Sequence, residues 1–133
     1  MHRINSNIPD IIKNCKRIAV VGLSGKPERD SYRVAELMKE SGYTVIPVNP
    51  GLDSVLGEKC YPTLRDVPGE IDLVDVFRRP EYAEAIVDQA IEKGVKAIWF
   101  QLGIVNREAA QKALKHGLQV VMDRCWSIEY YGL

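Results

Sequence analysis

Residues 17–31 read Arg17-Ile18-Ala19-Val20-Val21-Gly22-Leu23-Ser24-Gly25-Lys26-Pro27-Glu28-Arg29-Asp30-Ser31, an apolar run that stops at a glycine and opens into a small, polar, basic loop. The apolar run is rich in β-branched residues and does not alternate, which is typical of a strand buried on both faces of a parallel sheet. Gly22 and Gly25 allow a tight turn and a close approach of the backbone to a ligand. Asp30 or Ser31 is expected to cap the next helix, whose free N–H groups and positive dipole end favour an anion. The stretch therefore predicts a strand, a phosphate-binding turn and a helix.

The glycine spacing of this turn differs from two common phosphate motifs. A dinucleotide fingerprint that begins at Gly22 requires glycine at 24 and 27, where the chain has Ser24 and Pro27. The Gly-Lys-Ser/Thr ending of a P-loop is also absent. Because glycine also serves close packing at such turns, a turn without a ligand is the alternative. Basic residues in and after the loop favour the phosphate interpretation, with solvated surface as their other role; they are Lys26, Arg29 and Arg33.

Length and composition fit one globular domain over residues 1–133. Hydrophobic residues make up 46% of the chain and charged residues 27%, which allows a sizeable core. The 18 basic and 18 acidic residues cancel, so neither nucleic acid nor an anionic membrane is expected as a partner. No apolar run approaches the roughly 20 residues of a membrane span, and the first residues lack the apolar core of a secretory signal. A cytoplasmic protein is expected.

The cysteines and histidines indicate neither a disulfide framework nor a metal site. Cys15, Cys60 and Cys125 are an odd number at wide spacing, and only His2 and His116 accompany them. Free thiols are expected, and His116 is expected to cap the end of a helix. Cys125 follows an aspartate and an arginine at a strand end. It is therefore the best placed cysteine for a reactive role, such as a mixed disulfide with a ligand thiol; a buried structural thiol is the alternative.

Apolar strands and amphipathic helices alternate along the whole chain. Because each crossover helix must pack back on the sheet with the right hand, this alternation predicts a mainly parallel sheet. The expected fold is an α/β, three-layer, doubly wound, Rossmann-like single domain. Further strands are expected at residues 43–48, 58–61, 71–77, 97–102 and 118–122, a helical turn at 63–66, and helices at 9–15, 31–41, 80–93 and 106–116.

Ligands of such sheets bind at the carboxyl ends of the strands, near the point where the strand order reverses. The second strand ends at Asn49 and Pro50, without the carboxylate that an NAD ribose requires, and this neutral edge suits adenine or another flat group. Arg78 and Arg79 follow a strand expected to neighbour the first one, and either can pair with a phosphate in bidentate fashion. A surface role is the alternative for both and is favoured for Arg79. Coenzyme A, with its diphosphate and ribose phosphate, fits this set of groups better than NAD.

Several motifs together carry a family resemblance: Val20–Ser24 with Pro27, Arg29 and Ser31, then residues 42–50, 76–78, 99–103 and 121–125. Over roughly residues 15–125 the chain resembles the small CoA-binding domain proteins, which are similar to the N-terminal domain of the succinyl-CoA synthetase alpha subunit. The resemblance implies a Rossmann-like fold with a site for coenzyme A or an acyl-CoA. In that site the turn at 22–25 meets phosphates, and residues 49–50 and 76–78 border the adenosine. The residues predicted to contact the ligand are Gly22, Leu23, Ser24, Gly25, Lys26, Arg29, Ser31, Asn49, Pro50, Val76, Phe77, Arg78 and Gln101.

No catalytic constellation is evident in the sequence. The synthetases carry a phosphorylated histidine on a second domain, whereas the histidines here lie outside the matched motifs. Asp72 and Asp75 are expected on opposite faces of one strand, so they do not form an acid/base pair. Gln101 is expected either to donate a hydrogen bond to the ligand or to bond a neighbouring loop. Trp126, with the tyrosines near the C-terminus, is expected to be exposed and to pack on the domain or in a dimer contact.

A module that binds coenzyme A or an acyl-CoA as its small nucleotide ligand is the leading hypothesis for function. Such a module acts as a carrier, a sensor or a partner of another subunit. One alternative is an enzyme subunit that uses CoA or NAD with catalytic groups supplied by a partner. Another is an interaction protein whose nucleotide site has decayed. A homodimer or a complex with a partner subunit is compatible with each of these.

Overall fold

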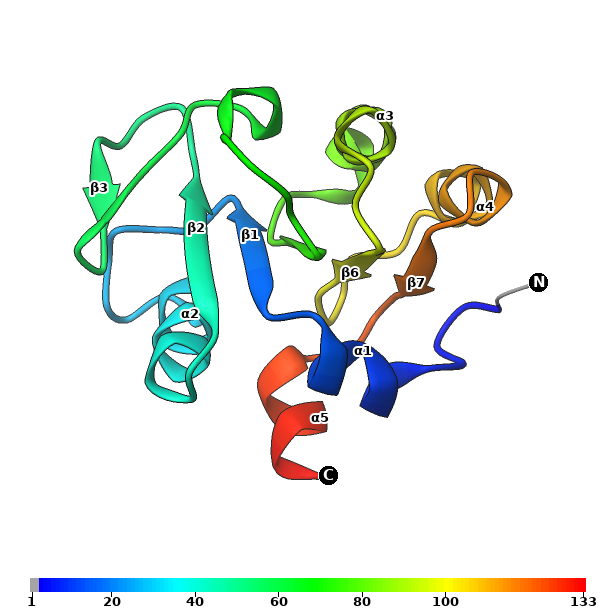
Figure 1. The fold of residues 1–133 in the computed structure, drawn as a ribbon, viewed down its shortest axis with the longest axis horizontal. Coiled ribbons are helices and arrows are strands. Elements are labelled where there is room, and N and C mark those ends of the chain that lie inside the picture. Colours follow the sequence, from blue (N-terminus) through cyan, green and yellow to red (C-terminus); the bar gives the residue numbers. More distant parts are fainter. Residues whose placement is uncertain (1–2) are drawn as a thin grey trace.

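A five-stranded parallel sheet forms the centre of the computed structural model, which describes residues 3–133. The strand order is β2-β1-β5-β6-β7. Helices α3 and α4 cover one face of the sheet, and α1, α2 and α5 cover the other (Figure 1). This arrangement confirms the three-layer, doubly wound, Rossmann-like α/β fold. The elements are α1 (Ile8–Asn14), β1 (Arg17–Val21), α2 (Asp30–Glu40), β2 (Thr44–Val48), β3 (Ser54–Val55), β4 (Glu58–Lys59), η1 (Leu64–Asp66), β5 (Leu73–Val76), η2 (Pro80–Tyr82), α3 (Ala83–Lys93), β6 (Ala97–Phe100), α4 (Arg107–Lys115), β7 (Gln119–Val121) and α5 (Trp126–Tyr131).

Each face of the sheet has its own hydrophobic core, because alternate residues of a strand point to opposite faces. Along β1, Ala19 and Val21 belong to the core beneath α3 and α4. Ile18 and Val20 belong to the core shared with α1, α2 and α5. The prediction of a strand buried on both faces, made from this unbroken apolar run, is thus confirmed.

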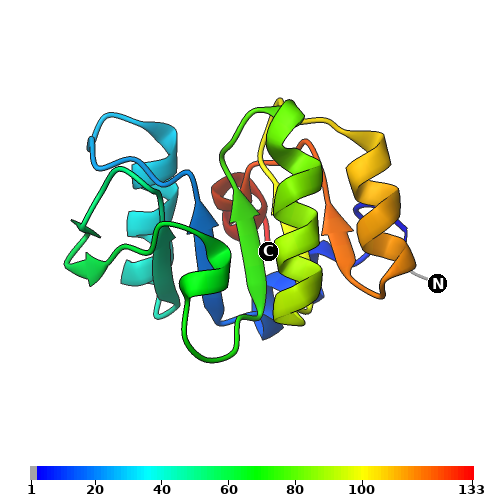
Figure 2. The ribbon, with the colours of Figure 1, turned by 90° about the horizontal axis from the view of Figure 1, so that it is seen from above.

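The strand order reverses between β1 and β5. β1 pairs in parallel with β2 on one side and with β5 on the other. The chain leaves β1 toward α2 on one face and leaves β5 toward α3 on the opposite face. The strand arrows end at one common edge, along the top of Figure 2, where the loops after β1 and β5 begin. Doubly wound proteins bind their ligands at this kind of edge.

Both outer strands of the sheet have a partner along part of their free edge. On β2, the carbonyl of Pro47 accepts a hydrogen bond from Tyr61 N at 3.0 Å, and Asn49 N donates to Tyr61 O at 2.9 Å. Pro47 itself has no N–H to donate, so the missing ladder bond expected there falls on an edge strand. On β7, Asn5 N donates to Val120 O at 2.9 Å. The Asn5 side chain also bonds both backbone groups of Met122.

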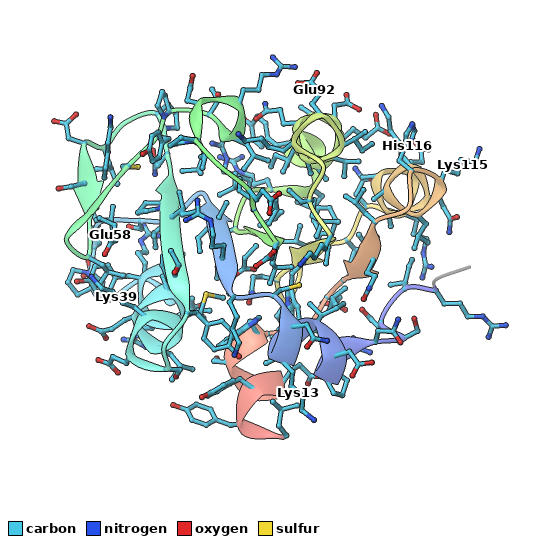
Figure 3. All side chains as sticks on the ribbon, viewed as in Figure 1. Lys13, Lys39, Glu58, Glu92, Lys115 and His116 are labelled. Carbon is cyan, nitrogen blue, oxygen red and sulfur yellow. The ribbon has the colours of Figure 1, made fainter. Side chains whose placement is uncertain are left out.

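The segment between β2 and β5 contains the hairpin β3–β4, of which the sequence predicted only the second strand, and in a longer form. The hairpin is attached to α2 by an ion pair between Lys39 and Glu58, with 3.0 Å between Nζ and Oε2. Figure 3 shows these two side chains together at the left of the molecule. The helical turn expected at residues 63–66 is confirmed as η1. Among residues 3–133, no helix combines the length and apolar character needed to cross a bilayer.

The C-terminal helix α5 was not predicted from the sequence. The expectation of an exposed Trp126 is wrong, because this side chain is completely buried. Trp126 stacks on Tyr130 with 4.9 Å between ring centroids and meets Tyr43 edge-on at 5.2 Å. The expected packing of these aromatic residues on their own chain is confirmed for Trp126. The short helix thereby closes the core on the α1 and α2 face.

Candidate functional site

Gly22 ends β1 in a conformation and a space that only glycine fits. Its φ is +87°, in the left-handed region that side chains rarely adopt. A Cβ added to Gly22 would lie 2.9 Å from Arg78 Cδ and 3.0 Å from Phe77 O. The backbone N–H of Gly22 donates to Val48 O at 2.9 Å. The carboxyl ends of strands β1, β2 and β5 therefore meet at Gly22.

Two serines hold the loop that follows Gly22. The Ser31 hydroxyl accepts a hydrogen bond from Ser24 N at 3.0 Å, and the Ser24 hydroxyl accepts one from Lys26 N at 3.0 Å. The expectation that Asp30 or Ser31 caps α2 is wrong. Arg29 occupies the N-cap position of α2, and no side chain caps the helix. Ser31 is buried, and its hydroxyl bonds the loop instead.

A cavity of about 440 Å³ opens over this loop and is called here the loop cavity. Its walls carry two cationic side chains, two hydroxyls and one carboxylate, and they include the first residues of α2. An uncapped helix start with cations beside it favours an anion. The residues that line the cavity are Gly22, Ser24, Lys26, Arg29, Asp30, Ser31 and Phe77.

Two predicted loop residues do not point into the loop cavity. The side chain of Leu23 is fully buried in the core, so this residue has only backbone atoms to offer a ligand. Gly25 faces Leu52, whose Cδ1 would lie 3.6 Å from an added Cβ. Val76 is likewise buried within β5. Their predicted ligand contacts are therefore limited to the backbone.

A second cavity, of about 180 Å³, lies on the α3 side of the same edge and is called the α3 cavity. Pro50, Tyr82 and Ile86 give it largely apolar walls. Arg78 also lines it, and the guanidinium carbon of this residue lies 4.4 Å from the centroid of the Tyr82 ring. The cavity is suited to a flat group next to a cation. Its lining residues include no carboxylate.

Asn49 does not line the α3 cavity, and its side chain instead bonds backbone groups at this edge of the sheet. Its Nδ2 donates to Leu23 O at 3.1 Å, and its Oδ1 accepts from Gly51 N at 2.9 Å. The side chain thus joins the loop after β1 to the turn after β2. Pro50, the next residue, is the one that reaches the cavity.

A third cavity, of about 310 Å³, lies beside α5 and is called the α5 cavity. It shares Asp30 and Phe77 with the loop cavity, so the two adjoin. Arg78, which follows Phe77, lines the α3 cavity. The loop cavity and the α5 cavity are therefore continuous, and the α3 cavity begins at the next residue of the chain. The other residues that line the α5 cavity are Arg33, Val34, Gln101, Leu102, Ile104, Cys125, Ser127 and Ile128.

Gln101 lines the α5 cavity but uses its amide within the protein. Its Nε2 donates to Asp75 Oδ1 at 2.7 Å, and its Oε1 accepts from Trp126 N at 3.4 Å. Burial raises the pKa of Asp75 to about 7, while the hydrogen bond from Gln101 acts in the opposite direction. Gln101 thus makes structural bonds, but they go to strand β5 and to the start of α5, not to a neighbouring loop as expected. The pair escaped sequence reasoning because Asp75 was considered only with Asp72.

The three cysteines are free, as expected, and differ in environment. Cys15 and Cys60 are buried, and burial raises the pKa of both thiols, that of Cys15 to about 11. Cys125 is half-buried at the α5 cavity, with its Sγ 3.0 Å from Ser127 Oγ. Within residues 3–133, no group of three His, Cys, Asp or Glu side chains is arranged to hold a metal. His116 caps the far end of α4, as predicted, and Figure 3 shows it there beside Lys115.

Comparisons with known proteins agree on one relationship. A family model described as a CoA binding domain matches residues 16–131. The Bacillus subtilis protein YneT is 41% identical over 125 residues, which cover 94% of this chain and 93% of YneT. The alpha subunit of ADP-forming acetate–CoA ligase II from Pyrococcus furiosus is 29% identical over 90% of this chain, which spans only 28% of that subunit. A solved structure of a hypothetical protein from Pyrococcus horikoshii OT3 superposes with a TM-score of 0.93 at 43% identity, covering 100% of this chain and 97% of that one.

Proposed function

The chain belongs to the CoA-binding domain family, and on this premise we propose that it binds coenzyme A or an acyl-CoA along the three adjoining cavities. The loop cavity beside Gly22 is the observation that carries the proposal. There two cations, the turn at Gly22 and the uncapped start of α2 converge where the strand order reverses. An anion of the size of a diphosphate is what this combination recognises.

The diphosphate is assigned to the loop cavity. Lys26 and Arg29 supply charge, and Arg29 also stands at the uncapped start of α2. Ser24 and Ser31 hold the loop in shape through their own hydrogen bonds. The loop is therefore preorganised, which reduces the entropy lost when a ligand binds.

The adenosine is assigned to the α3 cavity. Tyr82 and Pro50 offer apolar surface to a flat ring, and Arg78 can pair with a phosphate on the ribose or at the start of the diphosphate. The absence of a carboxylate among the lining residues favours CoA over NAD, whose ribose hydroxyls call for one.

The pantetheine arm is assigned to the α5 cavity, which adjoins the loop cavity at Asp30 and Phe77. Arg33 and Ser127 provide polar groups along it, Phe77 provides an apolar wall, and Gln101 lines it with an amide that is bonded within the protein. The thiol end of the ligand then comes to the neighbourhood of Cys125. Three free cysteines suit a reducing compartment, and a cytoplasmic location is part of the proposal.

In this proposal the chain is a carrier, a sensor or a subunit without its own catalytic centre. The experiment is a thermal-shift and calorimetric titration with CoA, acetyl-CoA, dephospho-CoA, NAD and ATP. CoA and acetyl-CoA should raise the melting temperature most, because a ligand that binds only the folded state stabilises it by mass action. An equal response to NAD would contradict the choice of ligand.

The similarity to an acetate–CoA ligase subunit favours one alternative, an enzyme subunit whose catalytic groups come from a partner. Native mass spectrometry of the protein isolated from its own cells separates the two functions. A carrier or sensor should appear with a bound CoA species and no second kind of chain. A stoichiometric second chain would support the alternative.

A further inference from the structure

We propose that the α5 cavity selects CoA thioesters of short aliphatic acids, with the acyl group seated between Leu102 and Ile128. This inference rests on the proposed function and adds to it the chemical class of the ligand. It starts from two side chains that the fold leaves open to water. Leu102 is 65% exposed and Ile128 63% exposed, and both line the α5 cavity.

The path of the ligand leads to these two side chains. With the diphosphate at the loop cavity and the adenosine on the α3 side of Gly22 and Arg78, the pantetheine arm is directed past Phe77. The α5 cavity begins at that residue. A group carried on the sulfur then lies farther along this cavity than the arm itself. Leu102 comes from the loop after β6 and Ile128 from α5, so two separate elements supply the walls.

The chemistry of the walls favours an aliphatic group. Val34 and Ile104 add further aliphatic surface to the α5 cavity. Its two charged side chains, Asp30 and Arg33, are of opposite sign, so the cavity offers no net charge to a carboxylate on the acyl group. An acyl chain that covers exposed aliphatic side chains removes apolar surface from water, whereas the free thiol of CoA does so far less. The cavity of about 310 Å³ must also hold the arm, which restricts the acyl group to a short chain.

The test is calorimetric titration of the whole chain with CoA, acetyl-CoA, butyryl-CoA and succinyl-CoA. Butyryl and succinyl have equal numbers of carbons, and only succinyl ends in a carboxylate. Each methylene added from acetyl to butyryl should tighten binding about two- to fourfold. Succinyl-CoA should bind no tighter than acetyl-CoA. Butyryl-CoA that binds no tighter than CoA, or less tightly than succinyl-CoA, would overturn the inference.

The double variant Leu102→Ser, Ile128→Ser tests the location of the acyl group. Its ratio of butyryl-CoA to CoA affinity should fall to about one, because the hydroxyls replace the apolar walls. Val105→Ser is the matched control: Val105 is 45% exposed on the same loop after β6 but lines none of the three cavities. This control should keep the wild-type ratio. A ratio that is unchanged in the double variant, or lost in the control, would overturn the inference.

Two results separate this inference from its premise. Failure of every CoA species to bind would overturn the proposed function itself. Binding of CoA without any gain from the acyl chain would overturn only the acyl assignment. Sedimentation of the double variant checks for a second copy on this surface. A dimer that dissociates in the double variant, with the butyryl ratio unchanged, would assign these residues to a protein contact and overturn the inference.

Discussion

Arg78 lies against Gly22 so closely that a Cβ on the glycine would come within 2.9 Å of Arg78 Cδ. This contact joins the ends of β1 and β5, the two strands between which the order of the sheet reverses. On one side of it lies the loop cavity, lined by Gly22, and on the other the α3 cavity, lined by Arg78. A ligand that occupies both cavities must pass this contact between Gly22 and Arg78.

Replacement Gly22→Ala should destabilise the fold and abolish CoA binding. The alanine adds left-handed strain and a clash with Arg78, which together should lower the free energy of unfolding by about 2 to 4 kcal/mol. Urea denaturation measures this loss. Gly42→Ala is the matched control, since Gly42 has a φ of +93° but nothing within 4 Å of an added Cβ. It should lose only the strain, about 1 to 2 kcal/mol, and keep CoA binding. Equal losses in the two variants would contradict the role of the contact.

Replacement Arg78→Ala should weaken CoA binding about ten- to a hundredfold, because a charged hydrogen bond to phosphate contributes about 1.5 to 3 kcal/mol. Calorimetry measures the affinity, and dephospho-CoA shows which phosphate is involved. A loss that disappears with dephospho-CoA assigns Arg78 to the ribose phosphate. Arg79→Ala is the control, because Arg79 is exposed and lines none of the three cavities. Unchanged affinity in Arg78→Ala would remove this residue from the site.

Replacement Asp75→Asn should make the fold less sensitive to pH. The native carboxyl, with its pKa raised to about 7, keeps a proton that the unfolded chain loses near its ordinary value of about 4. The unfolded state therefore binds fewer protons between these values, and stability falls as the pH rises. Asparagine still accepts the hydrogen bond from Gln101 without ionising. Relative to wild type, the variant should gain about 2 to 3 kcal/mol between pH 5 and pH 8, as measured by urea denaturation.

Replacement of Asp72 should change the pH dependence of stability in the opposite direction. Burial acts to raise its pKa, but hydrogen bonds from Arg17 N, Lys96 Nζ and Lys16 N outweigh it and hold the pKa below its usual range. Asp72→Asn should therefore be less stable than wild type at neutral pH, with the difference shrinking as the pH falls through the acid range. If the stability of both variants, relative to wild type, changed in the same direction with pH, the raised pKa of Asp75 would not explain the result for Asp75→Asn.

Cys125 should be the first thiol to react with iodoacetamide, and acetyl-CoA should protect it. Cys15 and Cys60 are 4% and 6% exposed, and the raised pKa of each reduces its thiolate. Peptide mapping by mass spectrometry measures the rates, and the urea-unfolded chain, in which all three should react, is the control. Saturating acetyl-CoA, which has no free thiol to consume the reagent, should slow alkylation of Cys125 at least about tenfold, since the α5 cavity is then filled. Alkylation at an unchanged rate with acetyl-CoA bound would place the arm elsewhere.

The fold followed from local sequence signals to a large extent. The apolar run before Gly22 was predicted to be a strand, and it forms β1. Asn106 caps α4 as predicted, accepting a hydrogen bond from Ala109 N at 3.0 Å. Each of these features depends on neighbours in the chain. The alternation of strands and helices then leaves few topologies, because crossovers have one hand.

Features that depend on distant residues were not predictable in this way. Ser31 looks like a helix cap, yet its hydroxyl is used by Ser24 in the loop. The pairing of Gln101 with Asp75 requires knowing that β5 and β6 are neighbours. The six residues of α5 are too few to show a helical period, and Trp126 is buried among residues distant in the sequence, such as Tyr43. Which side chains reach each cavity was therefore visible only in three dimensions.

The bonds that Tyr61 makes along β2 and Asn5 along β7 have a consequence for the protein at high concentration. Bare outer strands invite the same strand of another molecule to pair with them and to start a growing stack. Here a proline interrupts one rim, and a neighbouring segment already occupies part of each. Such obstruction disfavours fibril formation, so crowded solutions of the folded protein should remain clear.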